Sequence, residues 1–157
     1  MRRKVSESSG ISVSQSDTGS SQVARANIAA RSMADATEKL NEALELAEQF
    51  MEGLDMGVTA SVTLFHDEDA QWVHELRFGK AEGKWQLLVE SSYQSRYDSV
   101  DTTPLLRSSR EFRAMAVTKL EELVEALINT AEKQSAELTA RADLALNTIG
   151  RLRGEAE

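Results

Sequence analysis

The sequence predicts an α+β protein in which a disordered tail precedes a long N-terminal helix, a three-stranded antiparallel β-meander and a long C-terminal helical region. Three observations lead to this prediction. Apolar residues recur at steps of three and four over 26–54 and again over 112–152, which is the period of a helix that buries one side. Residues 58–91 alternate apolar and polar side chains, as half-buried strands do. Residues 1–22 show neither period.

Length and composition limit the classes of protein to which the chain can belong. Its 157 residues fit one domain with a tail, and 26 acidic against 18 basic residues give a formal charge of −8. Without cysteine it forms no disulfide, thiolate zinc site or cysteine nucleophile. No apolar run approaches the ~20 residues of a membrane span, and no apolar segment follows the basic residues 2–4 as in a signal peptide. We expect a cytoplasmic protein without membrane contact.

The N-terminal tail, residues 1–22, is expected to be disordered. It holds eight serines, and its large apolar residues are only Val5, Ile11 and Val13. Such a segment buries too little surface to offset the entropy of ordering it. A solvated terminus is the favoured interpretation, and an export leader, a phosphorylated arm or a basic tether are the alternatives. Residues 23–157 are assigned to a single α-β-β-β-α domain.

The first predicted helix begins near Val23 and ends at Gly53 and Gly57. Its apolar seam covers about four heptads, and half of its positions are alanine, so a partner can approach closely. The seam consists of Ala26, Ala29, Met33, Ala36, Leu40, Ala43, Ala47, Phe50 and Leu54, widened by Leu44 and Met51. Residues 33–57 carry seven acids and one lysine, which makes the outer face acidic.

The predicted meander occupies residues 58–91, with a polar connection at 66–71 and a glycine-bounded turn at 79–83. Pairing Val62 with Leu76, and Leu76 with Leu87, places the apolar side chains of all three strands on one face. The same register gives two further cross-strand rows, Ala60–Phe78–Trp85 and Leu64–His74–Val89. One face of the sheet therefore needs a cover, and the last helix is the expected cover.

The C-terminal helical region is expected to begin at Ser108, because Ser108-Ser-Arg-Glu111 has the spacing of a capping box and Thr103-Pro104 marks a break before it. Its apolar stripe divides into a Leu-rich half, 112–131, suited to a sheet and an Ala-rich half, 138–152, suited to another helix. Polar residues interrupt the stripe between the halves, so a break near 132–137 is compatible with the pattern.

The predicted helices are longer than the predicted sheet. A helix over 108–149 would be ~63 Å long, whereas strands of seven or eight residues span only ~25 Å. The surplus stripes must pack on each other, on a second copy or on another protein, and a self-contained monomer is disfavoured. The interface candidates are Met33, Leu40, Phe50, Leu138 and Ile149, which are equally good candidates for an intramolecular core.

A cluster of three arginines at the start of the last helical region is a candidate anion site. Unpaired backbone N–H groups and the helix dipole make such a position positive, so an anion would stabilise it. The candidate residues are Arg107, Ser108, Ser109, Arg110 and Arg113, with Arg96 as a further contributor. The favoured alternative is pairing within the chain, with Glu111, Asp98 or Asp101 or with the acidic first helix.

Other sites are not indicated. His66 and His74 lie near Asp67, Glu68, Asp69 and Glu75, and the predicted register places His66 opposite Trp72. Their spacing matches no known metal site, so we expect a half-buried, satisfied His74, and neither a metal nor a cofactor. Residues 79–84 resemble a phosphate loop but lie between strands and lack the Ser or Thr. Because no catalytic motif is present, we expect a protein that is not an enzyme.

The expected function is that of an intracellular interaction or assembly module. It would act through helix-mediated self-association, with a dimer favoured, or through capture of a partner helix. The order helix, meander, helix over about 26–135 resembles the small YbaB-type nucleoid-associated proteins, without a shared motif. That resemblance implies an acidic dimer that associates with nucleic acid, which the charge of −8 disfavours. A chaperone for an exported or aggregation-prone protein is the other alternative.

Overall fold

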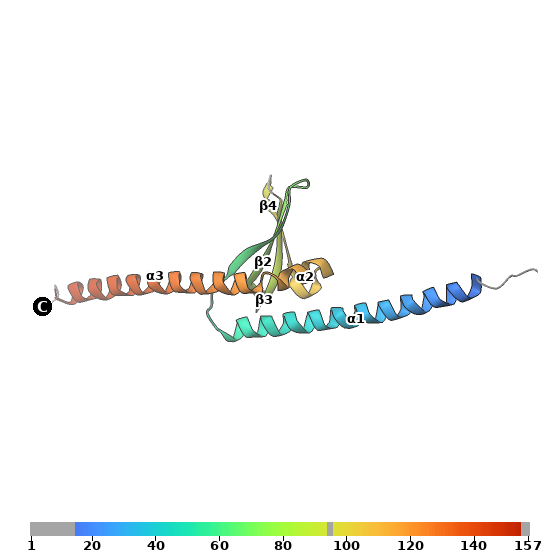
Figure 1. Ribbon diagram of the computed structural model, residues 1–157. Coiled ribbons are helices and arrows are strands. Elements are labelled where there is room, and N and C mark those ends of the chain that lie inside the picture. The colour runs from blue at the N-terminus through green and yellow to red at the C-terminus, as the bar shows by residue number, and fades with distance from the viewer. Residues whose placement is uncertain (1–14, 94–95, 155–157) are drawn as a thin grey trace, which may run out of the picture. The chain divides into compact units, whose positions relative to one another are not determined.

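The computed structural model describes residues 15–93 and 96–154 (Figure 1). The elements follow one another as α1 (Gln15–Gly53), β1 (Ala60–Asp67), β2 (Trp72–Ala81), β3 (Lys84–Tyr93), β4 (Arg96–Pro104), the 3-10 turn η1 (Leu105–Arg107), α2 (Arg110–Val117) and α3 (Leu120–Gly154). The α+β class and the two long helices agree with the sequence prediction. The chain divides into two compact units, Met1–Lys39 and Leu40–Glu157, which meet within α1.

In the first unit, the described part is the N-terminal portion of α1. The helix begins at Gln15, so the predicted disordered tail is helical over 15–22, and the rest of that tail lies outside the described residues. The segment that follows is rich in alanine, the strongest helix former, and this favours the continuous helix. Every described side chain from Thr18 to Ala36 is exposed.

The second unit contains an antiparallel sheet of four strands in the order β1-β2-β3-β4, one more than the sequence predicted. The additional strand is β4, which pairs with β3 through Val89↔Thr103 and Leu88↔Pro104. Its sequence, RYDSVDTTP, has no apolar alternation. An edge strand with only one neighbour can be polar, and this is why the strand period is missing from its sequence.

The register between β1 and β2 agrees with the prediction in its first half. Val62 lies opposite Leu76, and Ala60 lies opposite Phe78. An irregularity between Thr63 and Phe65 then shifts the pairing, so His74 faces Phe65 and not Leu64. For the same reason, His66 lies opposite Val73, and the predicted pairing of His66 with Trp72 is wrong. A bulge of this kind leaves no mark in the apolar pattern.

The register between β2 and β3 is two residues away from the predicted one. Leu76 lies opposite Val89, and Phe78 lies opposite Leu87. The turn is shorter than predicted, because it consists of Glu82 and Gly83 alone, with φ of 52° and 81°. Two residues with positive φ form the tight hairpin turn that matches strand twist. A shift of two keeps each side chain on its face, so the predicted apolar face is retained.

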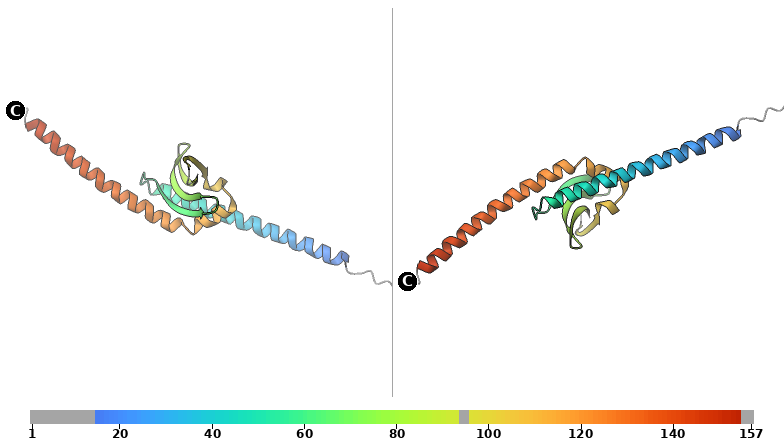
Figure 2. Two further views of the ribbon diagram at one scale, coloured as in Figure 1. Left: turned by 90° about the horizontal axis from the view of Figure 1, so that it is seen from above. Right: turned by 90° about the horizontal axis from the view of Figure 1, so that it is seen from below.

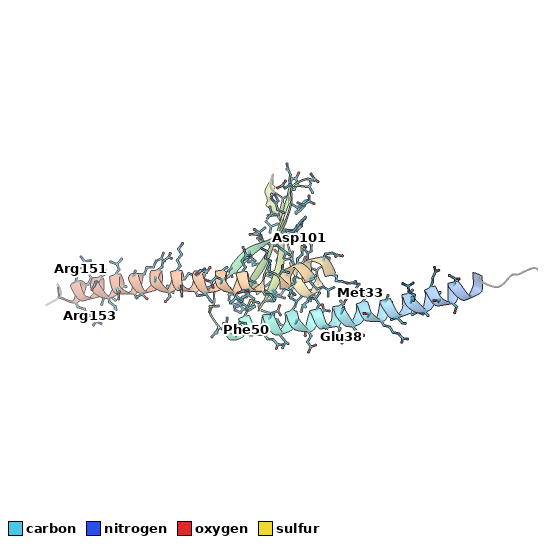
Figure 3. The ribbon with its side chains drawn as sticks, viewed as in Figure 1. Met33, Glu38, Phe50, Asp101, Arg151 and Arg153 are labelled. Atoms are coloured by element: carbon cyan, nitrogen blue, oxygen red, sulfur yellow. The ribbon has the colours of Figure 1, made fainter. Side chains whose placement is uncertain are left out.

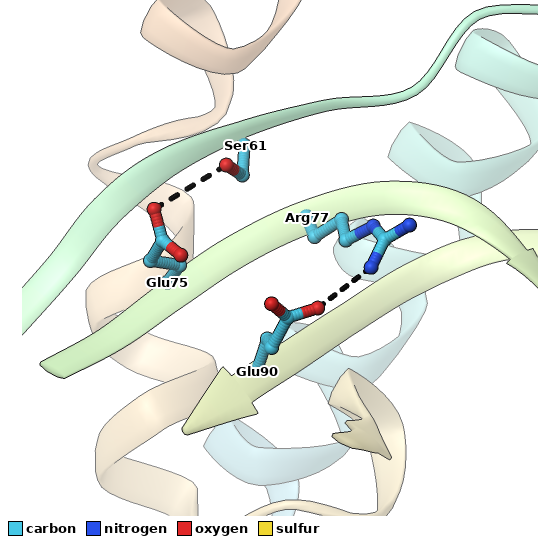
Figure 4. Close-up of polar contacts among 4 residues, drawn as sticks. All are labelled: Ser61, Glu75, Arg77 and Glu90. Atoms are coloured by element: carbon cyan, nitrogen blue, oxygen red, sulfur yellow. Dashed lines mark hydrogen bonds and ion pairs between the residues drawn. The ribbon is translucent and has the colours of Figure 1, made fainter. Parts of the chain in front are cut away.

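The core lies between one face of the sheet and the helices, and its buried residues come from every layer of the second unit. They are Leu44 and Met51 of α1, Val58, Ala60, Val62, Leu64, Leu76, Phe78, Leu87 and Val89 of the sheet and its approach, Leu105, Ala116 of α2, and Leu123 and Leu127 of α3. The opposite face carries polar pairs. Arg77 Nη1 donates to Glu90 Oε2 at 2.6 Å, and Ser61 Oγ donates to Glu75 Oε1 at 3.3 Å (Figure 4).

The C-terminal helical region is broken, but not where the sequence allowed a break. α2 ends at Val117 and α3 starts at Leu120, after which α3 is continuous through 132–137. The backbone N–H and the hydroxyl of Thr118 both donate to the carbonyl of Met115, at 3.1 and 2.7 Å. This hydroxyl bond favours a turn over helix continuation, as Thr side chains commonly do at helix ends. No helix within the described ranges is long and apolar enough to cross a bilayer.

Candidate functional site

The most distinctive surface of the second unit is the C-terminal part of α3, residues 132–154, called the α3 extension here. The sheet covers α3 only through Ala131, and Leu123 and Leu127 there are 0 and 1% exposed. Every residue of the α3 extension is exposed except the half-buried Thr148. Both views in Figure 2 show α3 continuing past the sheet. At 1.5 Å per residue the α3 extension is ~35 Å long.

The apolar face of α3 does not stop where the cover stops. Residues spaced by three and four continue the same side of the helix along the α3 extension, and they form the α3 stripe: Leu138, Ala142, Ala145, Ile149 and Leu152. The side chains of Leu138, Ile149 and Leu152 are 65, 47 and 62% exposed. An amphipathic helix whose apolar side faces water is the usual form of an unoccupied helix interface.

A second exposed apolar stripe lies on α1, beside the residues that α1 contributes to the core. Leu44 and Met51 are buried, but Leu46, Phe50 and Leu54 are 59, 60 and 40% exposed. These three residues are spaced by four and so lie on one side of the helix, which we call the α1 outer stripe. Figure 3 shows Phe50 near the C-terminal end of α1.

The two stripes lie in segments of opposite charge. Residues 40–54 contain four glutamates and no basic residue, whereas residues 138–154 contain three arginines and one aspartate. Figure 3 shows Arg151 and Arg153 near the end of α3. The ion pairs found among the described side chains are Arg77–Glu90 and Lys119–Glu122, so none of them neutralises either segment.

The five interface candidates from the sequence divide into two groups. Met33, Phe50, Leu138 and Ile149 are exposed, each by 47% or more. Leu40 is half-buried and packs against the core cluster. Leu40 is therefore core in this fold, and the other four remain available to a partner.

The residues of the predicted anion site are close in sequence but are used within the chain. Ser109 caps α2 by accepting the backbone N–H of Phe112 at 3.2 Å, one residue later than the predicted cap. Ser108 Oγ donates to the Leu105 carbonyl at 2.6 Å. Arg113 Nη1 donates to Asn41 Oδ1, while the buried Arg113 Nε has no hydrogen-bond partner.

A carboxylate of the chain itself occupies the positive end of α2. Hydrogen bonds from its own backbone N–H and from the side chain of Ser109 lower the pKa of Glu111, and Arg110 and Arg113 lower it further. Glu111 thus complements the positive end of α2, but among the described side chains no ion pair joins Arg107, Arg110 or Arg113 to an acid, and pairing within the chain also stays a prediction. Arg107 and Arg110 are exposed, and anion binding by this cluster stays a prediction.

The histidines show no arrangement for metal binding. His74 is half-buried, its Nδ1 lies 2.7 Å from Ser91 Oγ, and its ring packs on Phe112 with centroids 4.8 Å apart. It is thus a satisfied histidine, as expected. Among the described residues, no group of three or more His, Cys, Asp or Glu is placed to hold a metal ion.

One functional-looking group was not identified from the sequence. The backbone N–H of Leu87 donates to Glu48 Oε2 at 2.8 Å, and this bond connects α1 to β3. Leu87 lies just before Leu88, where the pairing of β3 with β4 starts. Burial raises the pKa of Glu48, and the Leu87 bond opposes that effect in part. Nothing in the sequence distinguishes Glu48 from the other glutamates of α1.

The cavity found beneath α1 in the described core is too small to hold a small molecule. The cavity lined by Met51, Val58, Phe78, Trp85 and Leu127 has a volume of about 10 Å³, which is at most the space of one water. The exposed stripes are therefore the best candidate site. Comparisons of the chain with protein-family models, with curated proteins and with solved structures found no match.

Proposed function

We propose that this protein is a non-enzymatic self-association module, in which the α3 stripe packs against a second copy of the chain. The observation that carries the proposal is the continuation of one apolar face from the covered part of α3 into the α3 extension. Nothing in the described part of the second unit covers Leu138, Ile149 or Leu152.

Covering these residues with a second copy would favour association through the burial of apolar surface. Complete burial of one Leu or Ile side chain stabilises by about 1.5–3 kcal/mol. A symmetric dimer would use the stripe twice, because each copy contributes the same surfaces to a closed two-fold assembly. This doubling supports a dimer over an open chain of copies.

The test compares two leucines of the α3 extension that are equally exposed. Leu138 lies in the α3 stripe and Leu144 lies outside it, and both are 65% exposed. We expect Leu138→Asp to shift the native mass from dimer toward the 17.3 kDa monomer in analytical ultracentrifugation, because a charge would be buried in the interface. Leu144→Asp should leave the native mass unchanged.

The result that would overturn the proposal is equally clear. If the wild-type chain sediments as a monomer over the whole accessible concentration range, it does not self-associate. If Leu138→Asp and Leu144→Asp reduce the native mass alike, the stripe is not the contact surface.

A further inference from the structure

We infer that the acceptor for the α3 stripe is the α1 outer stripe of a second copy, and that two copies exchange this contact reciprocally. The inference rests on the proposed self-association and names the surface on which it occurs. Both stripes belong to the second unit, so the inference requires no placement of residues 1–39.

The first argument is that one chain cannot join its own two stripes. Met51 and Leu127 line the same small cavity, so the C-terminal end of α1 lies beside the covered part of α3. Leu138 and Leu152 follow Leu127 by about 16 and 37 Å along a continuous helix. Because α3 is unbroken there, the α3 stripe cannot fold back onto α1.

The second argument is charge at the borders of the stripes. At about 100° per residue, Arg141 and Arg153 each lie about 60° from the centre line of the α3 stripe, on opposite sides. Glu42 and Gln49 lie about 80° and 100° from the centre line of the α1 outer stripe, on the side away from the core. Of these two border residues only Glu42 is charged, but the whole segment 40–54 carries four glutamates and no basic residue. The arginines that flank the α3 stripe would therefore meet an acidic segment of the second copy.

The third argument is that the same charges oppose the simplest alternative. If the α3 stripes of two copies packed on each other, Arg141 and Arg153 of both copies would border one interface. The acid of this segment, Asp143, lies about 140° from the centre of the stripe and could not neutralise them. Like charges brought together at an interface are unfavourable, so self-pairing of α3 is disfavoured.

The test changes the charge of one border at a time in the full-length chain. The first variant is Arg141→Glu/Arg153→Glu, which changes α3 alone. The second is Glu42→Lys/Gln49→Lys, which changes α1 alone. All four side chains are exposed, so both variants are expected to keep the fold, which circular dichroism checks. Arg151→Glu, about 140° from the α3 stripe, is the matched control.

Reciprocal exchange predicts a specific result in sedimentation equilibrium. Each variant alone carries like charges at both contacts, so its dimer dissociation constant should rise by about tenfold or more. An equimolar mixture of the two variants should recover the dimer, because both contacts of the mixed dimer again join opposite charges. The control should remain dimeric.

The outcomes separate this inference from the proposed function. If the wild type is dimeric and the α1 variant alone stays dimeric, α1 is not the acceptor, and the inference fails while self-association stands. If both variants weaken the dimer and their mixture does not recover it, the reciprocal contact is overturned. If the wild type is monomeric, the proposed function fails first.

Discussion

The two halves of α3 share one helix and one apolar face but differ in their surroundings. In residues 120–131 that face is mostly leucine and packs into the core. In residues 132–154 the same face is exposed, contains more alanine, and is interrupted by polar residues. The period of an apolar stripe therefore indicates that one side of the helix is buried in the native assembly. It does not indicate whether the sheet of the same chain or another protein surface buries it.

The largest difference between the two halves of α3 is expected in how much each contributes to the free energy of unfolding. Leu123→Ala removes a fully buried side chain, and we expect the free energy of unfolding to fall by about 2–5 kcal/mol. Leu138→Ala, in the α3 extension, should change the unfolding free energy of the dissociated chain by less than about 0.5 kcal/mol. Urea unfolding at low protein concentration measures both. Equal losses would mean that the two halves are covered alike.

The next prediction concerns local order along α3 and uses amide hydrogen exchange. In the dissociated chain, amides of 120–131 should exchange only with global unfolding, whereas those of the α3 extension should exchange faster toward Gly154. Association should slow exchange within 138–152 by at least about tenfold, because a covered helix opens less often. Uniform protection along α3 at every concentration would contradict the comparison.

The smallest effect tests the covered part of α1 through Glu48. Its raised pKa means that Glu48 favours the fold most below its ordinary value of 4.5, and that this contribution is lost as pH rises through the raised pKa. Glu48→Gln keeps an acceptor for the Leu87 N–H and cannot ionise. The variant should therefore gain stability relative to the wild type between pH 4 and pH 7.5. Thermal melts at both values measure this, and a difference independent of pH would show that Glu48 ionises without cost.

The sequence predicted those parts of the fold that leave a periodic apolar pattern. The core residues of the first three strands and of 120–131 were found because burial imposes such a pattern. β4 was missed because a polar edge strand has no apolar alternation. The two-residue turn between β2 and β3 was missed because the predicted and the observed β2–β3 registers place the same side chains on the apolar face. The break between α2 and α3 was missed because the apolar stripe continues across it, from Ala116 to Leu120.

The candidate site was predicted in part for the same reason. Phe50, Leu138 and Ile149 were identified because the stripes exceed the length of the sheet. The predicted seam of α1 treated Leu40 and Phe50 as one face, but in the structure Leu40 is half-buried against the core and Phe50 is 60% exposed. A straight helix drifts by about 20° per heptad from a 3.5-residue repeat, so a long seam passes from covered to uncovered side.

The uninterrupted course of α3 past the sheet has a further consequence for how fast and how tightly the α3 extension can bind. An isolated helix must first form a costly nucleus, for which the nucleation constant is about 10⁻³. The α3 extension needs none, because its first turn continues residues that the core already holds helical. A break at 132–137 would have made the segment a tethered, unordered peptide that loses its conformational freedom upon binding. In the unbroken helix, the core holds the α3 extension helical before it binds. Association therefore loses less conformational entropy than it would with an unordered segment.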